Sequence, residues 1–397
     1  MKIIFTIPSL YGGGAERVLK YLVENIQTNE KFLVTLESGQ KYDISQDVKY
    51  KKLTNIDGRS STIKKIFFFI IQYFKFNFFI NQEKPDIIIS FLERSNIISI
   101  LSLTNIKKVI SIRSFISKKF NDTGFKGKIV KIFYKYLFKK VKYFVVPTYE
   151  IKDDLIKNFQ IKSKNIQVIY NPIDLEKINQ LKKEPLDKEY QQMFKNNKVL
   201  INLGNLTNPK GQWHLIKVFS NLKKKHSGIK LVILGEGNLK YFLVNLSNNL
   251  GLKVFDIDSD KFDSNYDIYF LGFQKNPYKF LYKSDLFVFS SLREGFPNAL
   301  IEAMACELPI ISSNCQSGPK EILENGKYGV LLPVFNGNKN SLEISNIEQQ
   351  WIEKINEVLN CDMSQYKSLS KKRVQKYKMD NIIKIWEEYL KDLTNEK

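Results

Sequence analysis

Residues 285–323 read DLFVFSSLREGFPNALIEAMACELPIISSNCQSGPKEIL, and this stretch predicts a strand, a loop, a helix and a second strand. The apolar and aromatic run at 286–289 is typical of a buried strand in a parallel sheet. The Pro-Asn pair at 297–298 often begins a helix, and the small and apolar residues up to Cys306 favour its continuation. Pro309 then opens another short apolar run. The stretch is therefore one unit of an open α/β sheet.

Two glutamates of this stretch are placed to bind one ligand. Glu294 falls in the loop after the first strand, and Glu302 lies about a turn into the helix. In open α/β sheets ligands bind at the carboxyl ends of the strands, and the start of a helix offers backbone N–H groups to an anion. Two carboxylates beside an anion site suit a ligand that carries both hydroxyls and phosphates, such as a nucleotide-sugar.

The complete pattern resembles a known family signature. EGFPN at 294–298, the seven residues between Glu294 and Glu302, a helix of small residues and the Gly-Pro turn at 318–319 occur together. They resemble the E-x7-E signature of retaining GT-B glycosyltransferases, in particular glycosyltransferase family 4. The resemblance spans essentially the whole chain and is strongest in 200–330. It implies an α/β fold of the GT-B type, with two Rossmann-like domains whose parallel sheets face each other across a central cleft.

Length and composition are compatible with two globular domains. The chain has 397 residues, of which 43% are hydrophobic, enough for two cores of ordinary size. It contains no uncharged apolar run of 18 residues, so we expect no ordinary transmembrane span. Its first residues lack the cleavage pattern of a signal peptide and are expected to form a strand. The 3 cysteines and 2 histidines show neither a disulfide framework nor the spacing of a metal site, and the expected compartment is the cytoplasm.

Strand and helix patterns alternate through both halves, which predicts parallel sheets covered by helices. The turn NPID at 171–174 marks a boundary, so we predict one domain at 1–172 and a second, donor-binding domain at 173–379. The resemblance implies that the last helix, from about 380 to 397, packs back on the first domain. The predicted strands are 2–7, 32–36, 85–91, 108–112, 144–148, 168–170, 199–203, 230–234, 269–272, 285–290, a short run after Pro309, and 328–333.

Positive charge is concentrated in the first half. The net charge is +21, and residues 1–172 contribute +16 of it, with 30 Lys and Arg against 14 Asp and Glu. This half is therefore expected to face an anionic partner, either nucleic acid or anionic lipid. A composition rich in Lys, Asn, Ile and Phe accounts for a basic average without any such partner, but it accounts less well for the clustering.

A lysine stripe in this half favours a membrane surface. Lysines recur at helical spacing beside an apolar stripe, which is the pattern of a basic amphipathic helix lying on a bilayer. A second segment, 66–80, is almost wholly apolar and aromatic but too short to span a membrane, so it is either a core helix or an element that dips into the bilayer. The lysine stripe consists of Lys128, Lys131, Lys135, Lys139 and Lys142, and the apolar stripe of Phe125, Ile129, Phe133, Leu137 and Val141.

The second half contributes the residues that would bind a donor. Cleavage of a nucleotide-sugar leaves charge on its diphosphate, so fixed cations and backbone amides must stabilise it. Lys210, in the frame GNLTNPKG at 204–211, is the best candidate for this cation. The family usually carries an arginine where this chain has Asn205, which removes one expected diphosphate contact. The resemblance assigns Glu294 to the donor sugar and Glu302 to the ribose. It implies a donor-binding set, with the base near Gly272 and Phe273, of Gly13, Gly14, Asn205, Lys210, Gly272, Phe273, Glu294, Gly295, Phe296, Asn298, Ala299, Leu300 and Glu302.

The first half contributes further candidates. YGGGAER at 11–17 joins the first strand to a helix, and such a glycine loop either binds phosphate or is only a tight turn. Glu16 and Arg17 follow the glycines and are assigned to the acceptor side. Many relatives have a histidine where this chain has Arg113. We expect Arg113 to supply charge to the site, the alternatives being a solvated arginine or a lipid contact. The predicted catalytic set is Glu294, Lys210 and Arg113.

The resemblance implies a reaction as well as a fold. A hexose or N-acetylhexosamine would pass from a nucleotide-sugar, with UDP the expected carrier, with retained configuration and without a metal or other cofactor. The expected acceptor is a lipid-linked or growing glycan at the cytoplasmic face of the cell membrane, with the enzyme peripherally attached to that face. Two alternatives stay open: a GT-B nucleotide-sugar epimerase, and a non-enzymatic basic protein that binds membrane or nucleic acid. No nucleic-acid-binding motif is present, so nucleic acid is not an expected partner.

Overall fold

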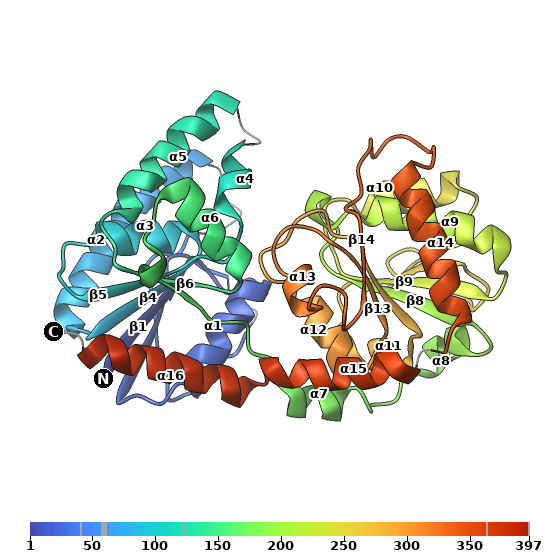
Figure 1. Ribbon diagram of the computed structural model, residues 1–397. Coiled ribbons are helices and arrows are strands. Elements are labelled where there is room, and N and C mark those ends of the chain that lie inside the picture. Colours follow the sequence, from blue (N-terminus) through green and yellow to red (C-terminus); the bar gives the residue numbers. More distant parts are fainter. Residues whose placement is uncertain (40–41, 57–61, 122–123, 363, 396–397) are drawn as a thin grey trace. The chain divides into compact units, whose positions relative to one another are not determined.

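The chain folds into two compact units in the computed structural model. Unit 1 comprises Met1–Pro172 and Met379–Lys397, and unit 2 comprises Ile173–Lys378. Each unit is a parallel sheet with helices packed on it (Figure 1), so the predicted α/β class is confirmed. The structure describes residues 1–39, 42–56, 62–121, 124–362 and 364–395.

The sheet of unit 1 has seven strands in the order β3-β2-β1-β4-β5-β6-β7, and all neighbours are parallel. Its central strands are almost continuously apolar because helices cover both faces of such a sheet. The direction of strand succession reverses between β1 and β4, and α/β folds of this kind bind ligands at such a reversal. The strands are β1 Lys2–Ile7, β2 Glu30–Thr35, β3 Lys49–Lys52, β4 Ile87–Phe91, β5 Lys107–Ser111, β6 Tyr143–Val146 and β7 Ile166–Val168.

The last helix of the chain completes the core of unit 1. Trp386 and Leu390 of α16 are buried in the same cluster as Leu19 of α1. The apolar residues of α16 recur at helical spacing, so one face of the helix is buried and the other is polar. The helices of unit 1 are α1 Gly14–Asn25, α2 Thr62–Glu83, α3 Glu93–Leu101, α4 Ile116–Asn121, α5 Gly124–Phe138, α6 Tyr149–Phe159, η1 Ser163–Asn165 and α16 Met379–Asn395.

Unit 2 repeats the architecture with its own seven strands, in the order β10-β11-β9-β8-β12-β13-β14. All neighbouring pairs are again parallel. Here the reversal lies between β8 and β12, which pair Leu200 with Leu286. The strands are β8 Lys198–Leu203, β9 Ile229–Leu234, β10 Val254–Asp256, β11 Ile268–Phe270, β12 Leu286–Phe289, β13 Ile310–Ser313 and β14 Val330–Leu332.

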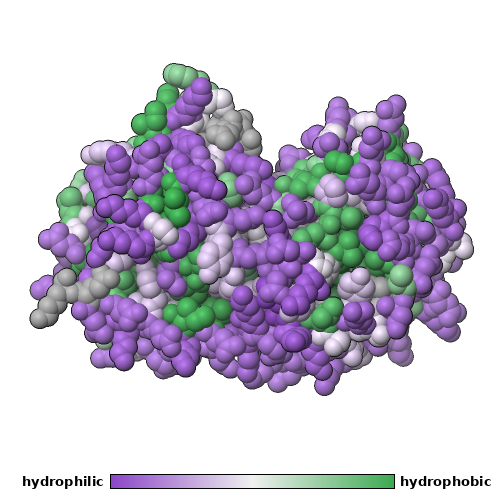
Figure 2. All heavy atoms as spheres, in the orientation of Figure 1, coloured by the Kyte–Doolittle hydropathy of each residue, from purple (hydrophilic) through white to green (hydrophobic). Residues whose placement is uncertain are grey.

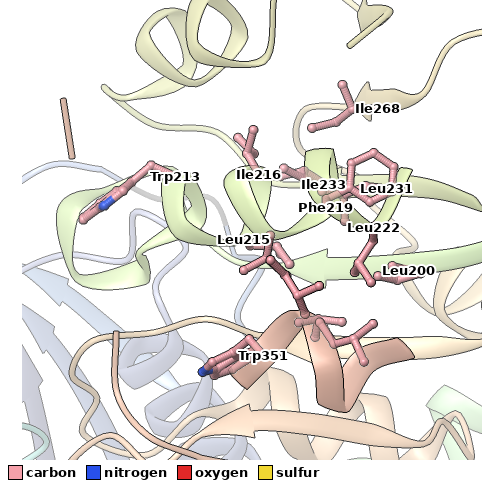
Figure 3. Close-up of a cluster of buried hydrophobic side chains, with 14 of the residues drawn as sticks. Leu200, Trp213, Leu215, Ile216, Phe219, Leu222, Leu231, Ile233, Ile268 and Trp351 are labelled. Atoms are coloured by element: carbon pink, nitrogen blue, oxygen red, sulfur yellow. The ribbon is translucent and has the colours of Figure 1, made fainter. Parts of the chain in front are cut away.

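The core of unit 2 holds helices α9 and α14 against the sheet. Phe219 of α9 and Trp351 of α14 are fully buried with Leu200 and Leu231 of the central strands (Figure 3). Burial of each such side chain stabilises the fold by about 1.5–3 kcal/mol, so these helices are held firmly against the sheet. The helices are α7 Leu175–Leu181, α8 Lys188–Phe194, η2 Asn208–Lys210, α9 Gln212–Lys225, α10 Lys240–Asn249, α11 Tyr278–Lys283, α12 Asn298–Ala305, α13 Pro319–Ile322, α14 Asn346–Asn360, α15 Ser364–Val374 and η3 Gln375–Tyr377.

The sequence patterns do not predict two strands, β3 and β10, and both lie at a sheet edge. All residues of β3, which reads KYKK, are exposed. An edge strand has no partner on one side, and lysines there discourage pairing with another chain. Such a strand lacks the apolar run on which the prediction depends.

The amphipathic helix predicted from the lysine stripe is α5, but it is shorter than the stripe. It ends at Phe138, whose ring packs against Phe144 and Phe159, and the chain then turns into β6. Lys139 and Lys142 therefore lie beyond the helix, and their placement on its stripe is wrong.

The apolar stripe of α5 also divides in two. Phe125, Ile129 and Phe133 are 78%, 55% and 45% exposed, whereas Leu137 and Val141 are buried in the core. Most of the buried side chains of α5 lie near its C-terminal end, and the other end of the helix projects past the sheet (Figure 1).

Helix α2, which contains the apolar segment 66–80, is a core helix on one of its faces, and whether it enters a bilayer stays a prediction. Phe76 and Ile80 are fully buried, whereas Phe74 and Phe78 are 65% and 73% exposed. One face of α2 therefore belongs to the core and another is an exposed aromatic surface. In the described part of the chain no helix is both long and apolar enough to cross a membrane.

Candidate active site

The reversal of strand order in unit 2 brings together two residues that are 84 positions apart. Lys210 ends the loop after β8, and Glu294 lies in the loop after the neighbouring strand β12. The Lys210 ammonium Nζ lies 2.6 Å from Glu294 Oε1. Their side chains are 23% and 11% exposed, so the ion pair is largely shielded from water. A preformed cation–carboxylate pair thus stands where α/β sheets bind ligands.

Backbone contacts fix the Lys210 loop to the β12 loop. The Ser290 hydroxyl donates to the Lys210 carbonyl at 2.9 Å, and the Leu292 N–H donates to Pro209 O at 2.8 Å. Gly211 follows in the left-handed region at φ +62°, where a Cβ would lie 2.6 Å from Ser290 O. Glycine is thus required at this turn, which lets α9 start directly behind Lys210.

Glu294 is held by more than the lysine. The Ser291 hydroxyl donates to the same Oε1 at 2.7 Å, and the Glu294 N–H donates to Gln316 O at 3.3 Å. Lys210 also lies 5.8 Å from the centre of the Phe289 ring. The sequence patterns do not single out Ser291 or Gln316, because short polar residues in loops have no distinguishing signal.

Glu302 lies on the inner side of α12 and is buried. The Tyr278 hydroxyl of α11 is 3.5 Å from its Oε1. The Phe296 ring is buried as well and packs edge-on against Tyr377, with ring centres 5.9 Å apart. Gly295, Asn298 and Ala299 are partly exposed beside it, whereas Leu300 is buried. The predicted donor set thus divides into residues at the surface of the α12 start and residues that support it.

The loop between β13 and α13 clamps the Glu294 loop from the other side. The Ser317 hydroxyl donates to Gly295 O at 2.6 Å. Gly318, with φ +108°, approaches so closely that a Cβ there would lie 2.3 Å from Pro297 Cδ. The Gly-Pro turn in the sequence therefore supports the start of α12 by close contact.

Two buried cations that the sequence does not identify hold the far ends of the site helices. Lys182 donates to Ala305 O at 3.1 Å and to Glu307 at 3.0 Å, at the carboxyl end of α12. Arg373 donates to Ile322 O at 2.8 Å, at the end of α13. A cation at a helix C-terminus satisfies its last carbonyls and its dipole.

Asn205 and Phe273 each follow a glycine just after a strand, Asn205 after β8 and Phe273 after β11. Close contacts between glycines hold these two strand ends together. Gly235 N–H donates to Gly272 O at 2.8 Å, and a Cβ on Gly235 would lie 2.1 Å from Gly204 O. Phe273 and Asn205 are exposed next to this tight corner. The corner places one exposed aromatic side chain and one amide at the carboxyl edge of the sheet.

Arg113 lies at the carboxyl edge of the sheet in unit 1, after β5. It donates hydrogen bonds to Asn171 Oδ1 and, at 3.5 Å, to Ser111 Oγ, and it lies 5.4 Å from the centre of the Phe91 ring. Burial lowers the pKa of Arg113 to about 9, so the guanidinium is a cation at pH 7. The structure thus holds Arg113 in place at a partly exposed position instead of leaving it solvated.

The glycine loop of unit 1 is closed by its own carboxylate. Glu16 Oε2 accepts from the N–H groups of Gly12 at 2.5 Å and Gly13 at 2.6 Å. Burial raises the pKa of Glu16, and these two hydrogen bonds only partly oppose the rise. Gly14 starts α1, and the N–H of Arg17 donates to Gly13 O. The loop therefore has the geometry of an anion site, with Glu16 as the anion.

An ion pair at this edge of unit 1 has no sequence signature. Arg94, at the start of α3, lies 2.5 Å from Glu37, which follows β2 and is almost fully buried.

Across the described residues of both units, no three His, Cys, Asp or Glu side chains are grouped as metal ligands would be.

Family comparisons cover nearly the whole chain. A family model described as "Glycosyl transferases group 1" matches residues 183–376, and a second, "Glycosyltransferase Family 4", matches 12–177. The E-x7-E stretch lies inside the first match and the glycine loop inside the second.

Individual relatives agree with the family models. An uncharacterised glycosyltransferase of Methanocaldococcus jannaschii is 36% identical over 64% of this chain, a match that spans 65% of that relative, just under two thirds. A Campylobacter jejuni enzyme, N-acetylgalactosamine-N,N'-diacetylbacillosaminyl-diphospho-undecaprenol 4-alpha-N-acetylgalactosaminyltransferase, is 29% identical over 85% of this chain and 87% of its own. The crystal structure of Anabaena HepE with UDP shares the fold, with a TM-score of 0.74, 16% identity, and coverage of 99% and 100% of the two chains.

Proposed function

Because this chain belongs to the family 4 glycosyltransferases, which have the GT-B fold, we propose that it transfers a hexose or N-acetylhexosamine from a UDP-sugar to a lipid-linked or growing glycan, with retention of configuration. UDP as carrier is supported by the fold shared with a UDP-bound protein. The acceptor class is supported by the Campylobacter relative, whose name specifies a diphospho-undecaprenol-linked glycan.

The observation that carries the proposal is the Lys210–Glu294 pair in the loops beside β8 and β12. An ammonium has three donors, and Glu294 uses one of them, so the others are available to a diphosphate. A cation that is already in position stabilises the charge of a leaving diphosphate without rearrangement. The first turn of α12 directs its backbone N–H groups to the same edge of the sheet, where they favour an anion.

The two glutamates take different parts of the donor in this proposal. Lys210 and Ser291 both contact Oε1 of Glu294, and Oε2 is left to accept from a hydroxyl of the sugar. Glu302 is buried on α12, about one turn after the start of that helix. It is the proposed partner of the ribose hydroxyls. Glu294 would thus orient both the sugar and the lysine that neutralises its leaving group.

A ligand screen followed by product analysis tests the function. Nucleotide-sugars that bind the folded protein should raise its Tm, and UDP-sugars are expected to do so where GDP- and ADP-sugars do not. The selected donor is then incubated with lipid-linked acceptors, and NMR of the product should show the anomeric configuration of the donor. Release of UDP without any acceptor, together with an epimerised sugar, would identify an epimerase and overturn the proposal.

We also propose that unit 1 docks on the cytoplasmic face of an anionic membrane. Lys128, Lys131 and Lys135 stand on α5 among exposed apolar side chains. Figure 2 shows hydrophobic surface beside hydrophilic surface at the projecting end of this helix. The exposed aromatic face of α2 adds a second apolar element, and α3 contacts both helices. Lysines attract anionic headgroups, and apolar side chains insert between them.

Vesicle sedimentation tests the docking. Wild-type protein should sediment with anionic vesicles, and salt should weaken this because it screens the charges. Replacing Lys128, Lys131 and Lys135 by Glu should release the protein, whereas replacing the exposed Lys188, Lys195 and Lys224 of unit 2 by Glu should not. Equal sedimentation with neutral vesicles would rule out the electrostatic part.

A further inference from the structure

A pocket of about 470 Å³ in unit 1 is lined by lysines from two separate segments. Three follow the end of α5, and two follow the end of α6. Neither Asp nor Glu occurs among the described residues that line it. The lysines are Lys139, Lys140, Lys142, Lys162 and Lys164.

The pocket is built on a packed base. Phe138 and Phe159, both buried, form its floor, with ring centres 5.5 Å apart. Gln160, the residue directly after α6, is in the left-handed region at φ 59°, which turns the chain sharply toward the lysines. The turn η1 follows, closed by the Asn165 N–H, which donates to Lys162 O at 2.9 Å. The walls are therefore held by the core of the unit.

This pocket is separate from the candidate active site. Lys142 directly precedes β6, and Asn165 directly precedes β7, so the pocket lies at the amino ends of these strands. Arg113 and Asn171 follow strands β5 and β7 and lie at the carboxyl ends. In a parallel sheet these are opposite edges. The pocket therefore does not serve the reacting groups of unit 1.

We propose that this pocket binds the phosphate monoester headgroup of an anionic lipid. The five lysines line the pocket without any Asp or Glu among its described lining residues, so the pocket has a positive potential that favours a bound anion. A phosphate monoester carries a charge of about −1.5 to −2 and three acceptor oxygens, more than a phosphodiester offers to the same lysines. A pocket of about 470 Å³ has ample room for such a headgroup.

The neighbouring helix indicates that the phosphate belongs to a lipid. The pocket begins where α5 ends, and α5 carries the exposed Phe125, Ile129 and Phe133. A headgroup in the pocket would hold the same helix whose apolar side chains enter the bilayer. The inference rests on the proposed membrane docking and adds to it a preference for one class of headgroup.

Two double variants with equal loss of charge separate the pocket from general attraction. Lys162→Gln/Lys164→Gln removes the pocket lysines that lie outside the α5 segment. Lys128→Gln/Lys135→Gln removes two lysines of α5 that do not line the pocket. Binding is measured to vesicles of phosphatidylcholine mixed with phosphatidic acid or with phosphatidylglycerol, matched in surface charge.

Wild-type protein should bind phosphatidic acid vesicles more tightly than phosphatidylglycerol vesicles. The pocket variant should lose about tenfold of this preference, whereas the α5 variant should bind both vesicles more weakly, about fivefold per lysine, with its preference unchanged. Equal weakening on both lipids by the pocket variant would overturn the headgroup site while leaving membrane docking intact. Absence of binding to any anionic vesicle would overturn the docking and, with it, this inference.

Inorganic phosphate distinguishes a lipid from a soluble ligand. Millimolar phosphate should displace the wild-type protein from phosphatidic acid vesicles only weakly, because it offers no apolar insertion. If free phosphate binds the wild-type protein as tightly as the vesicles do, and the pocket variant loses this binding, the pocket is a site for a soluble phosphate and the lipid assignment is wrong.

Discussion

His214 Nδ1 of α9 lies 2.6 Å from Glu348 Oε1 of α14, and both side chains are almost completely buried. Lys217 approaches the same oxygen at 2.8 Å, and Ser345 and Glu348 cap the start of α14 reciprocally. This cluster ties α14 to the helix that begins directly after the Lys210 loop. No function is predicted for His214 from the sequence, and the structure places it in the core.

The cluster makes the stability of unit 2 depend on pH. Burial raises the pKa of Glu348, but hydrogen bonds from His214, Lys217 and Ser345 lower it by more, so its pKa is below the ordinary value. A carboxyl whose folded pKa is lowered stabilises the fold above its unfolded pKa of about 4.3, and this contribution is lost as pH falls through the folded value. Urea unfolding of the wild type should show this loss below pH 4.3.

Glu348→Gln should remove that pH dependence and lower the free energy of unfolding at pH 7 by about 3–5 kcal/mol, because it leaves buried Lys217 without its carboxylate. Glu353→Gln, an exposed substitution on the same helix, is the matched control and should change stability by less than about 0.5 kcal/mol. Equal stability of the two variants would show that the cluster is dispensable.

Lys210→Ala should lower kcat/KM by a factor of about 10²–10³, because a leaving diphosphate loses its positioned cation. Asn205→Ala should cost about fivefold, since a neutral amide supplies one ordinary hydrogen bond of about 1 kcal/mol. Steady-state kinetics with a UDP-sugar compare them with Arg113→Ala. An active Lys210→Ala beside an inactive Arg113→Ala would transfer the role of diphosphate cation to Arg113.

The contact between Lys210 and Glu294 predicts that their effects on the reaction are not additive. Removal of Glu294 frees Lys210 from its position, so the double alanine variant should lose little more than the worse single variant. A double-mutant cycle on kcat/KM measures the coupling. Independent, additive losses would mean that Glu294 does not orient the lysine during turnover.

Glu302→Ala should act mainly on nucleotide binding, because ribose contacts exist before the reaction. Glu294→Ala should act mainly on kcat, because a sugar contact can strengthen in the transition state. Calorimetry with UDP and steady-state kinetics separate the two effects. If UDP binds Glu302→Ala as tightly as it binds the wild type, the ribose assignment is wrong.

Gly318→Ala should damage both stability and activity. Its Cβ would lie 2.3 Å from Pro297 Cδ, and displacement of Pro297 moves the Glu294 loop. Gly337 has a similar φ of +114° but nothing within 4 Å of an added Cβ, so Gly337→Ala carries only the backbone strain of about 1–3 kcal/mol. Thermal unfolding should show Gly318→Ala to be the less stable variant, with at least tenfold lower activity. If the two variants have equal stability and activity, Pro297 can move away from the added Cβ without a loss of either.

The sequence patterns predict the interior of the fold better than its edges and contacts. Buried strands such as β12 carry an unbroken apolar run, whereas the exposed edge strand β3 carries none. The patterns place Lys210 and Glu294 in loops after strands, but not in contact, because contact depends on β8 and β12 being neighbours across a gap of 84 residues. The patterns also do not predict that Glu16 closes the glycine loop. A glycine loop before a helix indicates that an anion can bind there, but it does not indicate that the anion is a side chain of the same loop.

The return of α16 to unit 1 affects the order in which the protein can fold during synthesis. Trp386 and Leu390, which fill the core of unit 1, are made after all of Ile173–Lys378. Unit 2 is a continuous segment and has its whole core once Lys378 is available. Unit 1 begins synthesis first, but it lacks part of its core until the ribosome has made α16. In a protein truncated before Met379, the part of α1 that α16 covers would therefore be exposed. Unit 1 would then be prone to aggregation and proteolysis.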